Sequence, residues 1–325
     1  MKLKDKFGRE INYLRLSVTD RCNLRCTYCM PEQGLTFAKR DNLLTYEELL
    51  QLVDILGELG ISKVRLTGGE PFVRADFMYF LRELRKKEFL EKISITSNLT
   101  LIRPHLNELL ELGIRDINVS LDALDKKKFF EITRRDEYDE VHKALMLMIE
   151  KGFNIKINCV VMKGTNEDQV LPLLKLAKEH PVSVRFLEEM PFNGSGETRK
   201  EVMNYKEILS LISARYDYSP LINEASSTSQ NYKIEGFAGS FGIIPSFSRT
   251  FCGDCNRLRL AATGEVRTCL YGGDELSLRD LLRSGISEEE IKETLVQAVG
   301  NKPKDGFAAA SENKEEYLSM TKLGG

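Results

Sequence analysis

The stretch Leu14-Arg15-Leu16-Ser17-Val18-Thr19-Asp20-Arg21-Cys22-Asn23-Leu24-Arg25-Cys26-Thr27-Tyr28-Cys29 joins a β-like run to three cysteines with the spacing C-x3-C-x2-C. Three thiolates can hold a four-iron cluster and leave one iron open, whereas a structural metal site fills its coordination shell with protein ligands. The stretch therefore predicts a strand over residues 12–18, followed by a reactive metal site formed by Cys22, Cys26 and Cys29.

Strand-like and helix-like segments alternate along the first two thirds of the chain. The predicted strands cover residues 12–18, 63–67, 92–97, 116–121, 155–162 and 182–187, and the predicted helices cover residues 46–59, 77–86, 104–112, 138–150 and 168–178. This alternation predicts parallel strands with right-handed crossovers. Because no Rossmann glycine fingerprint is present, we predict an α/β fold built as an incomplete (β/α)6 TIM-like barrel, with an open doubly wound sheet as the alternative.

The alternation ends after about Tyr216, where short strand candidates follow at residues 232–235, 241–244, 258–261 and 265–268. A helix is predicted to start at the capping box of Ser287 and Glu290, as another does at Thr45 and Glu48. We therefore divide the chain into a core of residues 1–215, which carries the first cysteine triplet, and a smaller α+β module of residues 216–325.

A second cysteine triplet lies in that module, at Cys252, Cys255 and Cys269, with the spacing C-x2-C-x13-C. Two triplets and one further cysteine make seven, which is typical of metal thiolates in a reducing compartment and not of a disulfide framework. The seventh, Cys159, lies in a β-like run, so we expect it to be an inert core residue.

The charge of the chain excludes some partners. With 47 basic and 49 acidic side chains the net charge is −2, so no overall field favours nucleic acid or an anionic membrane surface. No run approaches the roughly 18 apolar residues that a membrane span requires. We therefore expect a cytoplasmic protein that has neither a nucleic acid nor a membrane as its partner.

The first triplet has a simpler alternative, a zinc knuckle completed by a remote fourth ligand. The three histidines, His105, His142 and His180, lie in or at the end of predicted helices, where we expect surface or packing roles. In contrast, the triplet together with Gly68-Gly69-Glu70-Pro71 after the second strand resembles the radical S-adenosylmethionine (SAM) superfamily. The resemblance implies that SAM chelates the open iron and yields a 5′-deoxyadenosyl radical.

The same resemblance implies a SAM pocket at the carboxyl ends of the strands. Gly68 and Gly69 lack side chains that would keep the amino group of SAM from the backbone. Tyr28 matches the superfamily aromatic that lies near the adenine. The SAM contacts implied by similarity are therefore Tyr28, Gly69, Thr96, Ser120 and Met190.

The second triplet narrows the resemblance. The run Cys252-Gly253-Asp254-Cys255-Asn256-Arg257-Leu258-Arg259, followed by Cys269, resembles the GTP 3′,8-cyclases of molybdenum-cofactor biosynthesis, the MoaA proteins. Similar motifs extend nearly end to end, through Ile117-Asn118-Val119-Ser120-Leu121-Asp122 to Gly324-Gly325. The resemblance implies two 4Fe-4S clusters, with the open iron of the second cluster touching the guanine of GTP.

A triphosphate must be met by local cations, because the protein as a whole is nearly neutral. Five cations lie in predicted strands, where alternation can direct a side chain into a barrel lumen: Arg15, Lys63, Arg65, Lys156 and Arg185. Each alone could face solvent or pair with a carboxylate, but the five together favour an anion site. Arg257 and Arg259 match the substrate arginines of the family and complete the predicted GTP site, with a catalytic role.

The implied reaction is abstraction of the ribose 3′ hydrogen, addition of the C3′ radical to C8 of guanine, and uptake of an electron and a proton. The product would be (8S)-3′,8-cyclo-7,8-dihydroguanosine 5′-triphosphate, and the enzyme would be a lyase acting first in molybdenum-cofactor biosynthesis. An external one-electron donor is implied as a partner. The oligomeric state is left open, with a homodimer among the candidates.

Two positions depart from the family pattern, and the end of the chain matches it. Leu99 follows Asn98 where relatives usually have glycine, and Asp305 follows Lys302-Pro303-Lys304 where a histidine is common. The terminal Gly324-Gly325 resembles a double-glycine end that reaches the active site. Two other classes remain open: a radical SAM peptide modifier, which should carry more cysteines near its C-terminus, and a non-catalytic electron carrier or zinc-stabilised binding module, which needs four-ligand sites.

Overall fold

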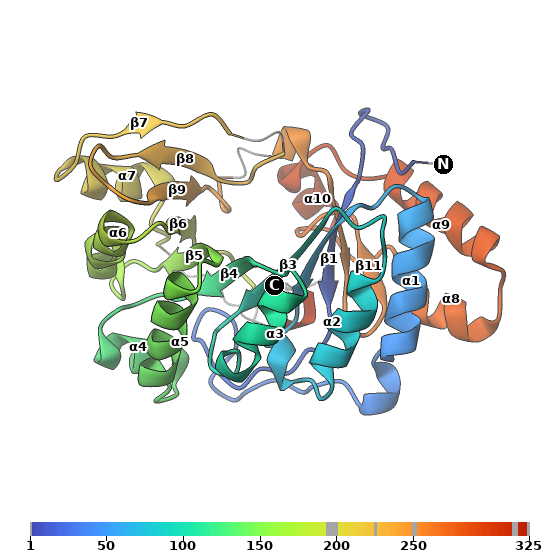
Figure 1. Cartoon of the computed structure of the whole chain (residues 1–325). Coiled ribbons are helices and arrows are strands. Elements are labelled where there is room, and N and C mark those ends of the chain that lie inside the picture. Colours follow the sequence, from blue (N-terminus) through green and yellow to red (C-terminus); the bar gives the residue numbers. More distant parts are fainter. Residues whose placement is uncertain (1, 193–200, 224–225, 249–251, 314–317, 324–325) are drawn as a thin grey trace. The chain divides into compact units, whose positions relative to one another are not determined.

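The computed structural model describes residues 2–192, 201–223, 226–248, 252–313 and 318–323, and Figure 1 labels its helices and strands. The chain folds into two compact units. The first unit combines Met1–Asn23, Leu35–Ile95 and Cys252–Gly325. The second unit combines Leu24–Gly34 and Thr96–Phe251. The predicted modules, divided after residue 215, stay a prediction about the functional organisation of the chain.

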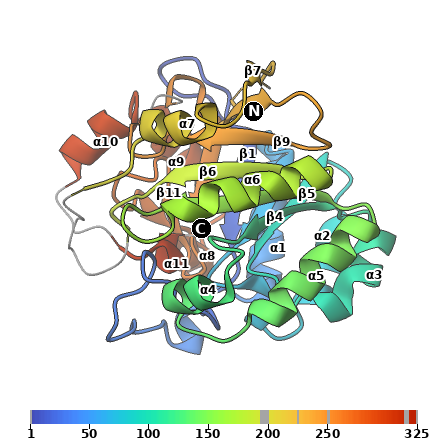
Figure 2. The same ribbon diagram turned by 90° about the vertical axis from the view of Figure 1, so that its left-hand side faces the viewer.

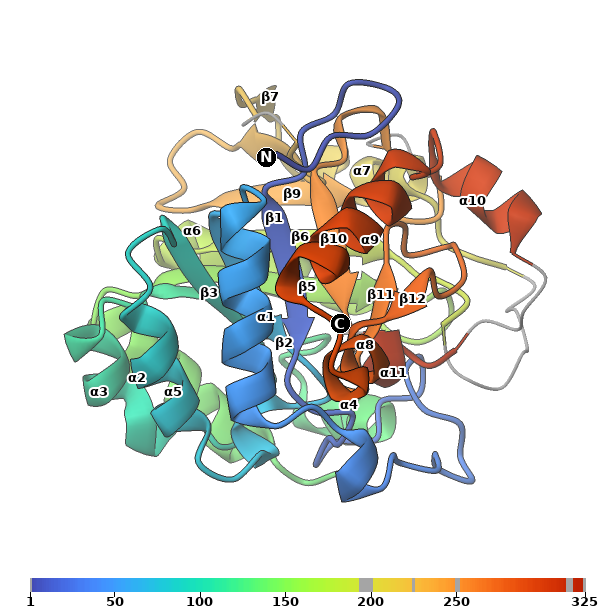
Figure 3. The ribbon, with the colours of Figure 1, turned by 90° about the vertical axis from the view of Figure 1, so that its right-hand side faces the viewer.

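The first unit contains both ends of the described chain. Its strands are β1 (Tyr13–Ser17), β2 (Lys63–Thr67), most of β3 (Lys92–Ser97), β10 (Arg257–Leu260), β11 (Glu265–Arg267) and β12 (Leu276–Ser277). Its helices are α1 (Tyr46–Glu58), α2 (Phe77–Arg85), α8 (Leu278–Ser284), α9 (Glu288–Gly300), α10 (Gly306–Glu312) and α11 (Met320–Leu323). The strand order is β12-β11-β10-β1-β2-β3, with β10, β1, β2 and β3 parallel. Figure 3 shows α1 beside α9.

The second unit repeats this pattern of parallel strands with an antiparallel end. Its strands are β4 (Asp116–Ser120), β5 (Asn154–Val161), β6 (Ser183–Glu188), β7 (Ser219–Pro220), β8 (Gln230–Lys233) and β9 (Ser240–Ile244). Its helices are α3 (Leu106–Glu111), α4 (Lys126–Thr133), α5 (Tyr138–Glu150), α6 (Val170–Glu179) and α7 (Tyr205–Ser213). The order is β4-β5-β6-β9-β8-β7, and β4, β5, β6 and β9 are parallel. Figure 2 shows α6 running along β5 and β6.

The six strands predicted in the first two thirds of the chain are confirmed, with ends that differ by at most one residue. The capping boxes are confirmed as well, because the Thr45 and Ser287 side chains accept the N–H groups of Glu48 and Glu290 at the starts of α1 and α9. Two helix predictions were partly wrong, because residues 103–105 and 167–169 form separate 3₁₀ turns before α3 and α6, as is frequent at the amino ends of helices.

The sequence did not indicate which strands the later strands pair with. In the first unit β10 extends the parallel set beside β1, and in the second unit β9 extends it beside β6. The α/β class and the mostly parallel pairing are confirmed, whereas closure into a partial barrel stays a prediction. None of the helices in the described ranges is long and apolar enough to cross a membrane.

In the first unit the parallel strands have one apolar face and one polar face. Leu14, Leu16, Val64 and Leu66 are fully buried, as expected for the face that the helices cover. The residues between them are polar and only half-buried, among them Arg15 on β1. This alternation places the predicted substrate cations of the unit on the face opposite the apolar core.

Candidate functional site

Five predicted GTP ligands of the first unit lie in two rows across neighbouring strands. Arg15 on β1 is in register with Arg259 on β10 and with Arg65 on β2. Two residues earlier along the strands, Tyr13 is in register with Arg257 and with Lys63. Because side chains two residues apart on a strand point to the same face, the register groups the five cations on one face.

Burial and mutual repulsion lower the pKa values of two of these arginines. Burial, and then the neighbouring Arg259 and Arg65, hold the pKa of Arg15 well below its usual range. Burial and the adjacent Arg257 lower the pKa of Arg259 to about 10. The Nε atom of Arg65 is buried and has no hydrogen-bond partner among the described residues. A face with this excess of positive charge is suited to a polyanion.

The second cysteine triplet directly adjoins this face, because Arg257 follows Cys255 by two residues. All three cysteines are half-buried and reduced. Burial, followed by the neighbouring Cys269, raises the pKa of Cys252. Burial acts in the same direction on Cys255, but the Lys302 ammonium and the Arg257 guanidinium outweigh it and lower its pKa to about 7. This environment favours a metal-binding thiolate at Cys255.

The backbone N–H groups of Gly69 and Glu70 hold the segment that leads to the first triplet. Gly69 donates its N–H to the carbonyl oxygen of Thr19 at 2.8 Å, and Glu70 donates to that of Arg21 at 2.9 Å. A Cβ atom on Gly69 would lie 2.2 Å from the Arg21 oxygen, so only glycine fits. These contacts hold Gly68-Gly69-Glu70 against the segment that leads to Cys22, and they give a structural reason for the two glycines.

Cys26 and Cys29 belong to the second unit, where the loop is held by backbone hydrogen bonds. The N–H groups of Arg25 and Thr27 donate to the carbonyl oxygens of Thr133 and Ile132, at 2.9 and 3.0 Å, near the end of α4. The thiols are half-buried and free of disulfides. In the described ranges no three His, Cys, Asp or Glu side chains are grouped closely enough to hold a single metal ion. The fit to a cluster is therefore judged on donor chemistry, and soft thiolates are the ligands of iron–sulfur clusters.

Tyr28, between these two cysteines, has a partner that sequence reasoning missed. Its hydroxyl donates a 2.9 Å hydrogen bond to the carboxylate of Asp122, just after β4. The second carboxylate oxygen of Asp122 accepts the N–H of Val160 at 2.8 Å. Burial raises the pKa of Asp122 to about 6. The Ser-Leu-Asp run at residues 120–122 contributes to the resemblance to the cyclase family, but no residue near it in the sequence indicates this contact.

The remaining predicted ligands lie in the second unit. Lys156 on β5 is in register with Asn118 and Ser183, while Arg185 on β6 is in register with Asn158. Ser120 pairs with Asn158 on the other side, at the carboxyl end of β4. Thr96 lies near the end of β3 and Met190 lies two residues after β6, both half-buried. The side-chain oxygen of Asn158 is buried without a hydrogen-bond partner in the described ranges, and so it is available to a ligand.

Two departures from the family pattern have structural explanations. Leu99 has a φ of +66°, the left-handed conformation that glycine adopts most readily, and its side chain is fully buried. Asp305 caps α10, because its carboxylate accepts the N–H groups of Phe307 and Ala308, both at 2.9 Å. The terminal Gly324 and Gly325 lie outside the described residues.

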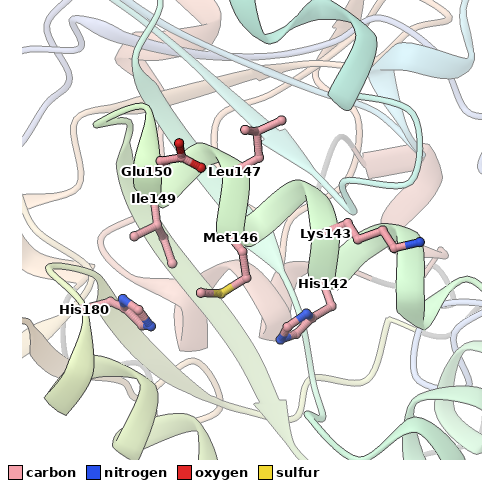
Figure 4. Close-up of a pocket in the computed structure, with 7 residues that line it drawn as sticks. All are labelled: His142, Lys143, Met146, Leu147, Ile149, Glu150 and His180. Atoms are coloured by element: carbon pink, nitrogen blue, oxygen red, sulfur yellow. The ribbon is translucent and has the colours of Figure 1, made fainter.

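A cavity of about 560 Å³ lies elsewhere on the second unit, against α5. Figure 4 shows His142 and His180 on either side of Met146. Its wall is mainly apolar and is formed by His142, Lys143, Met146, Leu147, Ile149, Glu150 and His180. It contains no cysteine and no predicted ligand, so we do not assign it to the candidate site.

Two family models match the chain, one over the part with the first cysteine triplet and one over the part with the second. The model of the radical SAM superfamily matches residues 16–177, and that of the molybdenum cofactor synthesis C family matches residues 182–308. A GTP 3′,8-cyclase of Clostridium perfringens is 38% identical over 328 residues, which cover 99% of this chain and all of that protein. The chain belongs to the GTP 3′,8-cyclase family of the radical SAM superfamily.

Other members of the family are longer. The human molybdenum cofactor biosynthesis protein 1 is 42% identical over 325 residues, which cover 99% of this chain and 51% of the human protein. The chain thus spans about half the length of several curated relatives. The mitochondrial GTP 3′,8-cyclase of Arabidopsis thaliana is 40% identical over 92% of this chain and 77% of that protein.

Solved structures support the fold of this family member. Streptococcus suis SuiB superposes with a TM-score of 0.60 at 16% identity, over 93% of this chain and 68% of that one. A structure titled native anSMEcpe with bound AdoMet and Cp18Cys peptide gives a TM-score of 0.54 at 17% identity, over 94% and 92%. Membership of the superfamily supports SAM and an iron–sulfur cluster as cofactors.

Proposed function

We propose that the chain is a GTP 3′,8-cyclase, a lyase that converts GTP to (8S)-3′,8-cyclo-7,8-dihydroguanosine 5′-triphosphate in the first step of molybdenum-cofactor biosynthesis. One observation carries the proposal: the cation rows of the first unit include Arg257 and Arg259, which directly follow the second cysteine pair. A triphosphate site on β10 and a metal site in the segment just before β10 would therefore adjoin each other, as required for a nucleotide bound at both ends.

The substrate side rests on Arg15, Lys63, Arg65, Arg257 and Arg259 in the first unit, together with Lys156 and Arg185 in the second. Arginine can form paired hydrogen bonds with phosphate oxygens, and its charge persists when it is buried. Neither Lys63 nor Arg65 is paired with a carboxylate in the described part of the chain, which is consistent with an anionic ligand.

Two 4Fe-4S clusters would be held by Cys22, Cys26 and Cys29 and by Cys252, Cys255 and Cys269. The SAM contacts would come from Tyr28, Gly69, Thr96, Ser120 and Met190. When bound, the first cluster and SAM supply the one-electron chemistry that generates a radical at the 3′ carbon of the ribose. An external one-electron donor is required by this chemistry.

The residues of the chain would orient the two reacting parts of GTP. Cyclisation requires the sugar carbon and C8 of guanine to be held within reach of each other, and fixing both can supply several kcal/mol of the barrier reduction. In the proposal Arg257 and Arg259 are catalytic because they touch the substrate beside the base-binding metal site. The Tyr28 hydroxyl, fixed by Asp122, keeps its ring in place for the adenine of SAM.

The proposal includes the architecture on which such a chamber depends. The core of residues 1–215 would close as an incomplete (β/α)6 barrel around SAM, and residues 216–325 would supply the second cluster and the guanine contact. The parallel strands of each unit support this arrangement. A homodimer is the oligomeric state that we propose to test by light scattering.

The reaction is tested by anaerobic incubation of the reconstituted chain with SAM, dithionite and GTP, followed by mass spectrometry. We expect 5′-deoxyadenosine together with a product isomeric with GTP. Omission of GTP should remove the isomer, and ATP should not replace GTP. Formation of 5′-deoxyadenosine with no isomer of GTP would contradict the substrate assignment.

The arginines are tested by Arg257→Ala and Arg259→Ala. We expect each variant to lose cyclisation and retain detectable cleavage of SAM, because the first triplet is unchanged. Arg283→Ala is the matched control, since that arginine lies on α8 and binds Glu48 at 2.7 Å. Full cyclisation by either test variant would remove its catalytic role.

The two clusters are tested by metal analysis after anaerobic purification. We expect about eight irons per chain with little zinc, and a loss of about half the iron when either triplet is replaced by serine. Stoichiometric zinc and stability in air would favour the zinc-stabilised binding module instead.

A further inference from the structure

Lys302 is a fully buried lysine in the first unit, two residues after the end of α9. Its side chain is 1% exposed. The Nζ atom donates hydrogen bonds to the carbonyl oxygens of Arg257, at 3.2 Å, and of Thr268. A buried ammonium group costs several kcal/mol unless an anion compensates it. No carboxylate forms an ion pair with Lys302 in the described ranges.

The two carbonyl groups that hold Lys302 belong to neighbours of the second cysteine triplet. Arg257 lies two residues after Cys255, and Thr268 immediately precedes Cys269. Lys302 therefore links the strand that follows one cysteine pair to the segment that carries the third cysteine.

Arg9 ties the same region from the N-terminal side. Its guanidinium donates to the carbonyl oxygen of Cys252 at 3.1 Å and to those of Pro303 and Lys304 at 2.6 and 2.8 Å. The Asp5 carboxylate lies 2.5 Å from Nε of Arg9 and balances its charge. Arg9 thus fixes the segment after Lys302 against Cys252, while the positive charge of Lys302 is left for another anion.

We propose that Lys302 is a positioning residue for the second cluster, and that its fixed positive charge raises the reduction potential of that cluster. The inference rests on the proposed function, because it requires a cluster at Cys252, Cys255 and Cys269. A cluster held by three thiolates is anionic and gains one further negative charge on reduction. A buried cation beside it stabilises the reduced form more than the oxidised form, and charge is one determinant of cluster potential.

The test uses the full chain with Cys22, Cys26 and Cys29 replaced by serine, so that only the second cluster remains. The potential is measured by anaerobic titration with dithionite, which donates the single electron, and is followed by electron paramagnetic resonance. K302Q removes the charge but keeps a donor for the two carbonyls, whereas K302R keeps the charge. We expect K302Q to shift the potential negatively by at least about 59 mV, a tenfold change for a one-electron couple, and K302R to stay close to the parent.

Arg74→Gln is the matched control, because Arg74 is another cation of the first unit held by two carbonyls, those of Val18 at 2.6 Å and Leu44 at 2.7 Å. It should leave the potential unchanged. Loss of iron from a K302Q chain that folds by circular dichroism, with iron retained by K302R, also supports the inference. If K302Q does not fold, K302M is the second neutral variant.

An unchanged potential and an unchanged iron content in a neutral variant would overturn the role of Lys302. That result is distinguishable from failure of the proposed function. If the parent with Lys302 intact assembles no cluster at the second triplet, the two-cluster proposal fails, and this inference fails with it.

Discussion

The hydroxyl of Tyr28 donates a 2.9 Å hydrogen bond to the buried carboxylate of Asp122. The contact joins the loop that carries Cys26 and Cys29 to the segment that follows β4 in the second unit. Asp122 is itself fixed, because its other carboxylate oxygen accepts the N–H of Val160 and its backbone oxygen accepts the Nδ2 group of Asn166 at 2.9 Å. The cysteine loop is thereby anchored to β5 through two successive hydrogen bonds.

Tyr28→Phe should destabilise the chain measurably. The substitution leaves an oxygen of Asp122 buried without a donor, at a cost of about 1–3 kcal/mol in urea unfolding. Asp122→Asn keeps an acceptor and should cost less. Tyr205→Phe is the control, because the Tyr205 hydroxyl makes no hydrogen bond with the described residues. Equal stability of Y28F and the parent would show that the contact contributes nothing.

Gly69→Ala should disrupt the first triplet. The new methyl group would meet the backbone of Arg21 and Cys22, where no flexible side chain can move aside, so strain of about 1–3 kcal/mol or a shifted loop is expected. Iron content after anaerobic reconstitution should fall in this variant. It should be normal in Gly300→Ala, because that glycine has no neighbour within 4 Å of an added Cβ. Full iron content in G69A would show that the loop tolerates displacement.

Leu99 combines an unfavourable backbone conformation with a fully buried side chain. Substitution by glycine should therefore cost no more stability than substitution by alanine, the reverse of the usual order. Leu99→Ala should cost about 2–5 kcal/mol in unfolding free energy. Leu99→Gly should be no less stable than L99A, because glycine recovers roughly 1–2 kcal/mol in the left-handed region. At the buried Leu109 of α3 the order should reverse, with glycine about 1 kcal/mol worse than alanine. The same ranking at both positions would contradict this explanation.

The ion pair of Glu48 and Arg283 should make stability depend on pH. The hydrogen bond from Arg283 lowers the pKa of Glu48 below its ordinary value of 4.5. A lowered carboxyl pKa stabilises the folded state above about pH 4.5, and this contribution is lost as pH falls through the folded-state value.

Glu48→Gln preserves the capping box and removes the charge. The loss should be at most about 1 kcal/mol at pH 7, since the pair is partly exposed, and it should shrink at low pH and in high salt. Unfolding curves between pH 7 and pH 3 measure the difference, with the exposed Glu47→Gln as the control. If the unfolding free energy of E48Q differed from that of the parent by the same amount at every pH, the charge of Glu48 would not be the cause.

The sequence by itself determined the local elements and the classes of ligand. β-like runs predicted β1 to β6, a period of 3.6 residues predicted α1 and α5, and the capping boxes at Thr45 and Ser287 marked helix starts. These signals are readable because they involve residues a few positions apart. The cysteine spacing and the strand cations were readable for the same reason.

Only the tertiary structure decided which distant segments meet. No short-range pattern in the sequence predicts that β10 pairs with β1 and so places Arg259 in register with Arg15. Nor does one predict that Lys302 is buried beside residues that flank Cys255 and Cys269. The contact of Tyr28 with Asp122 spans 94 residues. Such contacts form between residues far apart in the sequence, so they depend on how the whole core packs. The cost of burying a charge, which makes the partners of Lys302 and Asp122 matter, arises only once the chain has folded.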